Sequence, residues 1–377
     1  MRRSCPSSTP PRATTPVRRT PLYERQRAAG GRMVAFAGWE MPQQYSTVKA
    51  EQHAVRTAAG VFDVSHMGRF EARGEGSEAF LQGLVTNDLG RLKAGAAQYN
   101  LLCREDGGVL DDLIVYRRPH SWLLVVNAAN REKDLAWFRR HAPEAVEVVD
   151  RSEETCLLAA QGPAAARLLP AQGVDLESLP PFGIASGRIA GAEVLLSRTG
   201  YTGEDGFELF VPASDATRVW DRLLEAGFLP CGLACRDVCR LEAGLRLYGS
   251  DMDEQTNPYE AGLGWTVKLQ KGEFSGRRAL EAARAAGPRR VLVGLECSGR
   301  LIPRPHAEIH LDGRRVGVVT SGTYSFWLER GIGFASVEVE ARTGATVSID
   351  RRDGQGEAKL VPLPFYRGSF GRAAVTT

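Results

Sequence analysis

The chain has 377 residues, of which 43% are hydrophobic and 25% charged, with a formal net charge of +3 and a pI near 8.5. This length is enough for two or three domains, each with its own core. Basic and acidic residues are interspersed and no run of about 18 apolar residues occurs, so the charge does not suggest nucleic-acid binding and the hydropathy argues against a membrane span.

The first 20 residues form a segment of distinct composition. They are rich in Arg, Ser, Thr and Pro, contain no acidic residue and have no apolar stretch, so we expect a disordered leader at 1–20. Organellar transit peptides are also basic and free of acids, but the prolines here interrupt any amphipathic helix. We therefore expect a cytoplasmic bacterial protein, with the mitochondrial matrix as the alternative if the leader is a transit peptide.

The rest of the chain mixes helical and strand patterns without the regular alternation of a doubly wound sheet. The periodicity predicts strands at 109–117 and 122–126, and helices at 77–84, 131–141 and 215–226. After about residue 287 the chain becomes a series of short β-rich runs broken by turns, which is typical of a small barrel or sandwich. The predicted fold class is α+β, with an all-β C-terminal domain.

The stretch GYTGEDGFE at 200–208 has glycines at every third position. A phosphate-binding loop would lead from a strand into a helix, but strand-like runs flank this loop on both sides, so we expect a hairpin in which Asp205-Gly206 supplies positive φ. The acids Glu204, Asp205 and Glu208 would also repel a phosphate. Glu208 stands in an apolar strand and is expected to have a partner there, either an Arg or a ligand with two parallel N–H donors.

The stretch GGVLDDLIVY at 107–116 places two carboxylates at the start of a strand. Successive strand residues point to opposite faces, so at most one of Asp111 and Asp112 enters a given pocket and the other is solvated or caps a turn. The pair is either two turn aspartates or a turn aspartate beside one buried acid that handles a proton or orients a nitrogen. Tyr99 and Asn127 are the polar residues that could meet such an acid.

A third stretch, 232–249, predicts a helix that carries Arg236 and Arg240. Charges on such a helix are usually solvated, but Arg240 is suited to meet a buried carboxylate such as Glu208. The same helix would align Cys231, Cys235 and Cys239 on one face. These thiols are either a metal site or small packing residues, and no His or fourth thiol completes a ligand set.

Taken together, these segments resemble the glycine cleavage system T-protein family. The resemblance runs in order from Thr20 to Phe370 and includes TPLYERQRAAGGRMVAFAGWEMPQQY, GVFDVSHMGRF, VTND, GGVLDDLIVY, VVNAAN, GYTGEDGFE, RDVCRLEAGLRLYG, EAGLGWTVKL and VGVVTSGTYS. The family has a multidomain folate-binding aminomethyltransferase fold around a central folate site. Carried over to this chain, it implies a body at 21–284 and a β-barrel at 285–377. The body would comprise two interleaved subdomains, roughly 21–51 plus 137–244 and 52–136 plus 245–284.

The resemblance also implies an activity. A member of this family transfers the one-carbon unit of the aminomethyl group on the dihydrolipoyl arm of H-protein to tetrahydrofolate, and releases ammonia and 5,10-methylenetetrahydrofolate. The implied co-substrate is tetrahydrofolate with no metal, and the implied partners are lipoylated H-protein and, functionally, glycine decarboxylase and dihydrolipoyl dehydrogenase. By matching motifs, Asp112 corresponds to the catalytic aspartate, and the folate-site positions are Glu208, Arg240, Tyr201, Tyr99, Asn127, Met67, Tyr116 and Tyr248, with Arg367 at the rim.

Two other functions remain alternatives. One is a folate-binding protein of iron–sulfur cluster maintenance, whose Lys-Gly-Cys-Tyr-x-Gly-Gln-Glu motif is replaced here at 271–278 by KGEFSGRR, without the cysteine. The other is a stand-alone tetrahydrofolate-dependent demethylase of a small methylated compound.

Overall fold

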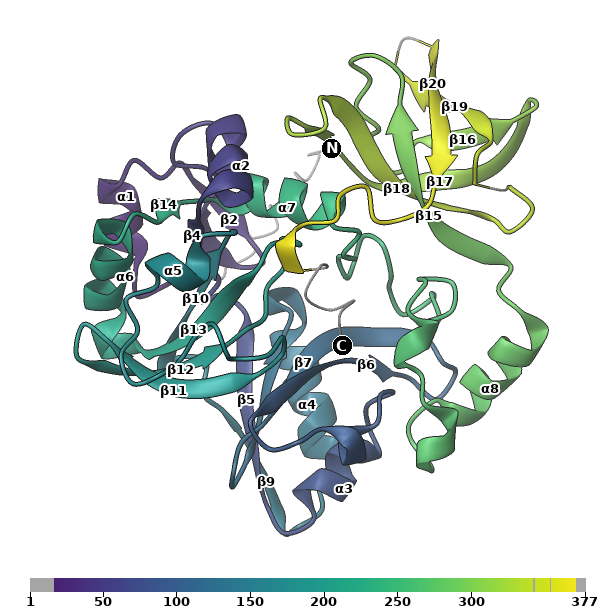
Figure 1. The fold of residues 1–377 in the computed structure, drawn as a ribbon. Coiled ribbons are helices and arrows are strands. Elements are labelled where there is room, and N and C mark those ends of the chain that lie inside the picture. The colour runs from purple at the N-terminus through teal and green to yellow at the C-terminus, as the bar shows by residue number, and fades with distance from the viewer. Residues whose placement is uncertain (1–16, 342, 353, 371–377) are drawn as a thin grey trace, which may run out of the picture.

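The computed structural model describes residues 17–341, 343–352 and 354–370. The fold contains a six-stranded sheet, a five-stranded sheet, a small three-stranded sheet and a closed barrel. Figure 1 shows the six-stranded sheet with α1 and α6 on its outer side and α7 on the side towards the barrel, the five-stranded sheet below it and the barrel above and to the right. The mixture of sheets with helices and the closed C-terminal barrel confirm the predicted α+β class with an all-β C-terminal domain.

The six-stranded sheet has the order β11-β12-β13-β10-β4-β14. Helix α6 (Ala216–Glu225) packs on it through Val219, Trp220 and Leu223, which lie on one side of the helix and are fully buried. The other elements of this half are β4 (Gly60–Asp63), β10 (Thr155–Gln161), β11 (Ile184–Ile189), β12 (Ala192–Ser197), β13 (Gly206–Pro212), β14 (Leu229–Pro230), α1 (Tyr23–Ala28), α2 (Val48–Thr57), α5 (Ala165–Leu168), α7 (Leu233–Glu242) and η3 (Ala213–Asp215).

The five-stranded antiparallel sheet has the order β6-β7-β8-β5-β9. One face packs on α4 (Arg131–His141), where Phe138 meets Phe70 edge to face in an apolar cluster. The sheet and its connections consist of β5 (Gly68–Gly74), β6 (Ala96–Cys103), β7 (Val109–Arg117), β8 (Trp122–Val126), β9 (Val146–Asp150), α3 (Ser77–Gln82), η1 (Leu89–Arg91) and η2 (Ala128–Asn130).

The two large sheets share a core. Tyr116 of β7 meets Phe210 of β13 edge to face, with ring centroids 5.3 Å apart, in a cluster that also contains Phe62 and Leu123. The side chains of β7 and β13 that point between the sheets are therefore brought near one another.

The C-terminal barrel has the strand order β15-β18-β17-β16-β19-β20 and closes on itself. Helix α8 (Arg277–Ala286) precedes it, and the segment after β20 runs back from the barrel towards the two sheets (Figure 1). The barrel strands are β15 (Arg290–Cys297), β16 (Glu308–Leu311), β17 (Arg314–Ser325), β18 (Arg330–Glu338), β19 (Thr346–Arg351) and β20 (Gly354–Val361), and η4 (Gly264–Thr266) and η5 (Leu269–Lys271) lie before α8.

The small sheet changes one expectation about the leader. Arg18 and Arg19 form β1 (Arg18–Arg19), which pairs with β3 (Trp39–Pro42), and β3 in turn pairs with β2 (Met33–Phe36). Thr20 is buried and its hydroxyl donates to Asp63 at 2.6 Å. The predicted disorder is therefore wrong for residues 17–20, because backbone pairing and this buried hydrogen bond hold them. The remainder of the predicted leader, 1–16, lies outside the described residues.

Two strand pairings differ from the predicted subdomain boundaries. Strand β4 falls in the predicted 52–136 piece but pairs with β10, and β9 falls in the predicted 137–244 piece but pairs with β5. The chain therefore crosses from one sheet to the other between β4 and β5, and returns between β9 and β10. A strand's sheet is decided by a distant partner, so these two crossings do not coincide with residues 52 and 137.

Most of the predicted elements are confirmed. The strands at 109–117 and 122–126 and the helix at 131–141 have the predicted bounds, and the helices at 77–84 and 215–226 differ by one or two residues at their ends. Among the described residues, no helix has the length and apolar character needed to cross a bilayer.

Candidate active site

A cavity of about 1210 Å³ lies where the two large sheets, α7, the barrel and the C-terminal segment meet. Its wall includes Asp112 of β7, Glu208 of β13, Thr320 of β17 and Arg367. Every predicted site residue except Tyr116 lines this one cavity. The sequence places these residues far apart, so the tertiary fold brings them together.

Glu208 is held on β13 opposite Ser197 of β12, which confirms the predicted hairpin. The side chain is 9% exposed, and its Oε2 accepts hydrogen bonds from Thr199 Oγ1 at 2.6 Å and from the Tyr116 hydroxyl at 3.3 Å. None of the described residues donates to Oε1. Tyr116 thus lies behind Glu208 and fixes it, while one carboxylate oxygen stays available as an acceptor.

Asp112 enters the cavity from β7. Its Oδ1 accepts from Asn127 Nδ2 at 2.7 Å and its Oδ2 from the Tyr99 hydroxyl at 3.1 Å. Burial, together with the negative charge of Asp111, raises the pKa of Asp112 to about 7. A carboxyl group in this state can take up or release a proton near neutral pH.

Asp111 is neither solvated nor a turn cap, contrary to both options that the sequence left open for the second aspartate. It is fully buried, and its carboxylate accepts from the backbone N–H of Asn127 at 3.1 Å and from the side-chain amides of Asn127 and Asn130 at 2.8 and 2.7 Å. A β-bulge opposite Leu102 and Cys103 shifts the register beside it. Asn127 therefore donates to both aspartates although they are consecutive strand residues.

Arg240 lines the cavity but does not pair with Glu208, so that expected ion pair is wrong. Its guanidinium donates to Asp237 at 2.8 Å, to Asp251 at 2.6 Å and to Ser321 of the barrel at 2.9 Å. These partners use its donors to join α7 to the barrel.

Arg236 lies one helical turn earlier on the same face, and it was assigned no role in the site from the sequence. Its Nη1 is buried without a hydrogen-bond partner among the described residues, and its guanidinium carbon lies 4.7 Å from the centre of the Tyr201 ring. Burial lowers the pKa of Arg236, and the charge of Glu208 opposes that shift. The i, i+4 spacing from Arg240 was the available signal, because it places both side chains on one face.

The remaining predicted residues occupy different parts of the wall. The Tyr201 hydroxyl donates to the backbone carbonyl of Arg246, and Tyr248 accepts from Lys133 Nζ at 3.0 Å. Met67 contributes apolar surface, and Arg367 is exposed at the rim, where no described residue accepts a hydrogen bond from it. The cavity wall also contains Trp265, which was not identified from the sequence. Its side chain is 58% exposed, and its ring stacks on Tyr99.

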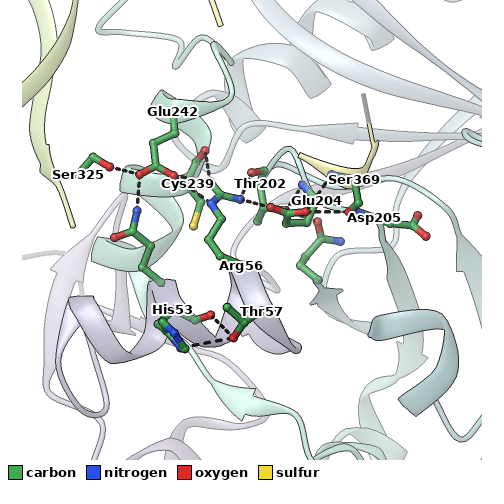
Figure 2. A network of polar contacts seen from close by, with 12 residues as sticks. His53, Arg56, Thr57, Thr202, Glu204, Asp205, Cys239, Glu242, Ser325 and Ser369 are labelled. Carbon is green, nitrogen blue, oxygen red and sulfur yellow. Dashed lines mark hydrogen bonds and ion pairs between the residues drawn. The ribbon is translucent and has the colours of Figure 1, made fainter. Parts of the chain in front are cut away.

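The other acids of the 200–208 loop have cationic partners. Figure 2 shows Arg56 between Glu204 and Glu242, to which it pairs at 3.0 and 2.5 Å with all three side chains buried. Glu204 also accepts from the backbone and hydroxyl of Ser369, at 3.0 and 2.7 Å, so the loop holds the C-terminal segment over the cavity. Gly203, at φ 79°, rather than Gly206, supplies the positive φ of this loop.

The three close cysteines lie in the core that the two sheets share. Cys235 and Cys239 have their sulfur atoms 4.0 Å apart, and Glu51 completes a group with Cys231 and Cys235 that is compact enough for a metal ion. The Glu51 carboxylate, however, accepts from three backbone N–H groups, those of Tyr45, Ser46 and Gly232. Burial raises the pKa of Cys231 above its usual value. These contacts favour the packing interpretation.

Two family models match the chain over most of its length. The model described as "GCVT N-terminal domain" matches residues 22–271, and the one described as "Glycine cleavage T-protein C-terminal barrel domain" matches residues 290–367. The chain belongs to the glycine cleavage T-protein family. The family assignment made from the sequence motifs is thereby confirmed.

Full-length relatives agree with this family. A protein named aminomethyltransferase from Rubrobacter xylanophilus is 52% identical over 93% of this chain and 95% of its own length. Another from Geobacillus kaustophilus is 49% identical over 93% of this chain and 99% of its own. The solved structure of the glycine cleavage system aminomethyltransferase T from Bartonella henselae superposes with a TM-score of 0.88 at 34% identity, covering 94% of this T-protein chain and 99% of that one.

Proposed function

We propose that this T-protein is the aminomethyltransferase of a glycine cleavage system. It takes the one-carbon unit from the aminomethyl group on the dihydrolipoyl arm of H-protein and passes it to tetrahydrofolate, with release of ammonia and 5,10-methylenetetrahydrofolate. The observation that carries the proposal is that Glu208 and Asp112 line the same cavity with different hydrogen-bond partners.

The cavity residues fit a reduced folate. Its volume, about 1210 Å³, is ample for a ligand of that size. Glu208 has a free carboxylate oxygen, and its charge acts on Arg236, which has an unpartnered N–H group and lies over the Tyr201 ring. A pterin ring presents the 2-amino group and N3–H side by side next to a carbonyl oxygen. Glu208 would accept from the two donors as a charge-assisted pair, and Arg236 would donate to the carbonyl.

Asp112 is assigned the acid–base role. It is the one predicted site carboxylate whose pKa is raised to about 7, and Tyr99 and Asn127 fix both of its oxygens. Placed near the N5 and N10 nitrogens of the folate, its carboxylate would orient the amine and accept its proton as the new bond to the one-carbon unit forms. Such positioned acid–base groups typically contribute about 10²–10⁴-fold to the rate.

The partners follow from the proposed reaction. Lipoylated H-protein supplies the aminomethyl group, glycine decarboxylase loads it, and dihydrolipoyl dehydrogenase reoxidises the arm. Arg240 stays a predicted folate-site position, although its donors are committed to Asp237, Asp251 and Ser321. We place the protein in the bacterial cytoplasm, in keeping with the bacterial origin of the two relatives named above.

The direct test supplies the purified chain with aminomethylated H-protein and tetrahydrofolate, and measures ammonia and 5,10-methylenetetrahydrofolate. We expect both products in equal amounts, and neither when the H-protein carries no aminomethyl group. Absence of turnover with tetrahydrofolate binding intact would contradict the transferase assignment and leave the demethylase or the non-catalytic folate-binding protein. Small methylated amines in place of H-protein would then separate those two alternatives.

A further inference from the structure

Asp134 is a buried acid behind the cavity wall that the proposed chemistry does not use. It lies in the first turn of α4 and is fully buried. Neither of its carboxyl oxygens receives a hydrogen bond from an N–H or hydroxyl group of the described residues. A charged carboxylate is costly to bury without a donor, so the state of this group needs an explanation.

The group that Asp134 faces is another carboxyl, that of Asp111, which acts on Asp134 through its charge and through a side-chain hydrogen bond. Asn130, four residues before Asp134, donates to Asp111 at 2.7 Å, so α4 begins with both residues directed to this carboxyl. Two carboxyl groups in contact form a hydrogen bond only if one of them holds a proton. Asp111 already accepts three N–H hydrogen bonds, so its oxygens act as acceptors, whereas neither oxygen of Asp134 accepts any. The proton therefore belongs on Asp134.

The other charged groups near Asp134 leave this assignment in place. The charge of Lys133 opposes the rise in the pKa of Asp134. The Lys133 ammonium group, however, donates to the backbone carbonyl of Leu110 at 2.7 Å and to the Tyr248 hydroxyl at 3.0 Å, and pairs with Glu254 at 3.4 Å. The charge of Asp112, like that of Asp111, disfavours a second negative charge. Burial and the Asp111 carboxylate together raise the pKa of Asp134 far above its usual value.

We propose that Asp134 is protonated and donates a hydrogen bond to Asp111, and that this acid–carboxylate pair positions Asn127 against Asp112. Asp111 anchors Asn127 through both its backbone N–H and its side-chain amide. The same amide nitrogen donates to Asp112 Oδ1 at 2.7 Å. Asp134 thus acts on Asp112 through Asp111 and Asn127, as a positioning residue. The effect of Asp134 on catalysis rests on the proposed function of Asp112. The protonation of Asp134 does not depend on that function.

The proton is tested by infrared spectroscopy on the full chain labelled with ¹³C-aspartate, at alkaline pH where Asp112 is charged. We expect the C=O stretching band of a protonated carboxylic acid in the wild type and its loss in Asp134→Asn. A wild-type spectrum without this band would overturn the proposal. This measurement needs no substrate, so it decides the question even if the chain turns out not to be an aminomethyltransferase.

The positioning role is tested by comparing Asp134→Ala with Asp134→Asn. Asparagine is isosteric, uncharged and able to donate to Asp111, so it should keep kcat close to the wild type. Alanine removes the donor, and the resulting misplacement of Asp112 should lower kcat by about 10- to 100-fold while KM for tetrahydrofolate changes little. Asp221→Ala, at a surface position of α6, serves as the matched control.

Each outcome of that comparison decides the proposal. If Asp134→Asn were as impaired as Asp134→Ala, the neutral-donor role would be wrong. A rise in KM with unchanged kcat would also overturn the positioning role. Should Asp134→Ala fail to fold, Asp134→Asn still has to fold and turn over like the wild type, and its failure to do so would overturn the proposal.

Discussion

Asp112 and Glu208 show how neighbours give the same functional group two different tasks. Asp112 is close to the negative charge of Asp111, and burial and this charge bring its pKa to about 7. Glu208 receives two hydroxyl hydrogen bonds on one carboxylate oxygen and lies near the Arg236 charge, which leaves its other oxygen available as an acceptor. One carboxylate is thus adapted to move a proton and the other to hold a ligand.

For Asp112→Asn we expect normal tetrahydrofolate binding and a kcat lower by about 10²–10⁴-fold, because the amide keeps the shape but cannot accept a proton. Stopped-flow or steady-state assays with aminomethylated H-protein measure the rate, and calorimetry measures binding. Asp221→Asn on the surface of α6 should behave as the wild type. Equal loss of binding and rate in Asp112→Asn would argue against a role in the chemical step.

The pH dependence of the same variant supplies a second control. Because the pKa of Asp112 is raised, its carboxyl is protonated below pH about 7 and charged above it. The wild-type rate should therefore rise with pH through this region and then level off. The residual rate of Asp112→Asn should not rise with pH in this region. If the rise were still present in the variant, the titrating group would be a residue other than Asp112.

Glu208→Gln tests the pterin-binding role. Hydrogen bonds to a charged group contribute about 1.5–3 kcal/mol, which corresponds to roughly 10- to 100-fold in Kd for tetrahydrofolate. Titration calorimetry measures the change, with Glu225→Gln at the exposed end of α6 as the matched control. An unchanged Kd would show that the ligand does not contact this carboxylate.

At the scale of elements, the β12–β13 hairpin does two jobs. Its returning strand presents Glu208 to the cavity, while Glu204 in the loop faces Arg56 of α2 and Ser369 of the C-terminal segment (Figure 2). Arg56 also pairs with Glu242 at the end of α7, whose carboxylate accepts from Ser325 of the barrel. One buried guanidinium therefore ties together α2, the hairpin and α7, and its two carboxylate partners reach the barrel and the C-terminal segment.

Arg56→Met should destabilise the protein by about 3–5 kcal/mol, because it leaves Glu204 and Glu242 buried without a cation. Urea unfolding followed by fluorescence measures the decrease. Arg222→Met, which breaks an exposed ion pair with Glu225, should cost less than about 1 kcal/mol. Similar small effects of both variants would mean that the buried network adds little to stability.

At the scale of the whole molecule, the cavity exists only where the two sheets, the barrel and the C-terminal segment meet. After β20 the chain returns from the barrel, and the backbone N–H of Tyr366 donates to the backbone carbonyl of Glu242 while the Ser369 hydroxyl donates to the Glu204 carboxylate. This return path delivers Arg367 to the rim. An exposed arginine there is suited to the carboxylates of a folate tail that extends out of the cavity.

Arg367→Met is expected to raise the Kd of tetrahydrofolate by about two- to fivefold at low ionic strength, the size of an exposed charge interaction. The effect should shrink as salt is added, because exposed charges are screened. Binding isotherms at several salt concentrations measure it, and Arg315→Met on the outside of the barrel is the control. A salt-independent effect would indicate a packing role instead.

Much of the fold was predictable from local patterns. Strands β7 and β8, helix α4 and the hairpin around Glu208 follow from periodicities and turn signals that each span a few residues. The sheet membership of β4 and β9 was not predictable in this way, because each of these strands pairs with a partner remote in sequence. The small sheet that holds Arg18 and Arg19 was not predicted for the same reason.

The sequence by itself determined the family, the elements, and the identity of Asp112 and Glu208 as the site's expected acids, because these rest on local residue order. The tertiary structure decided which groups have partners. Arg236 and Arg240 share one helix face. The fold brings Asp251 and Ser321 to the guanidinium of Arg240 but brings no acceptor to Nη1 of Arg236 among the described residues. Likewise, only the approach of Asp134 on α4 turns the pair Asp111–Asp112 into a set of three carboxyl groups. Partners of this kind come from distant parts of the chain, so they cannot be predicted from the local sequence.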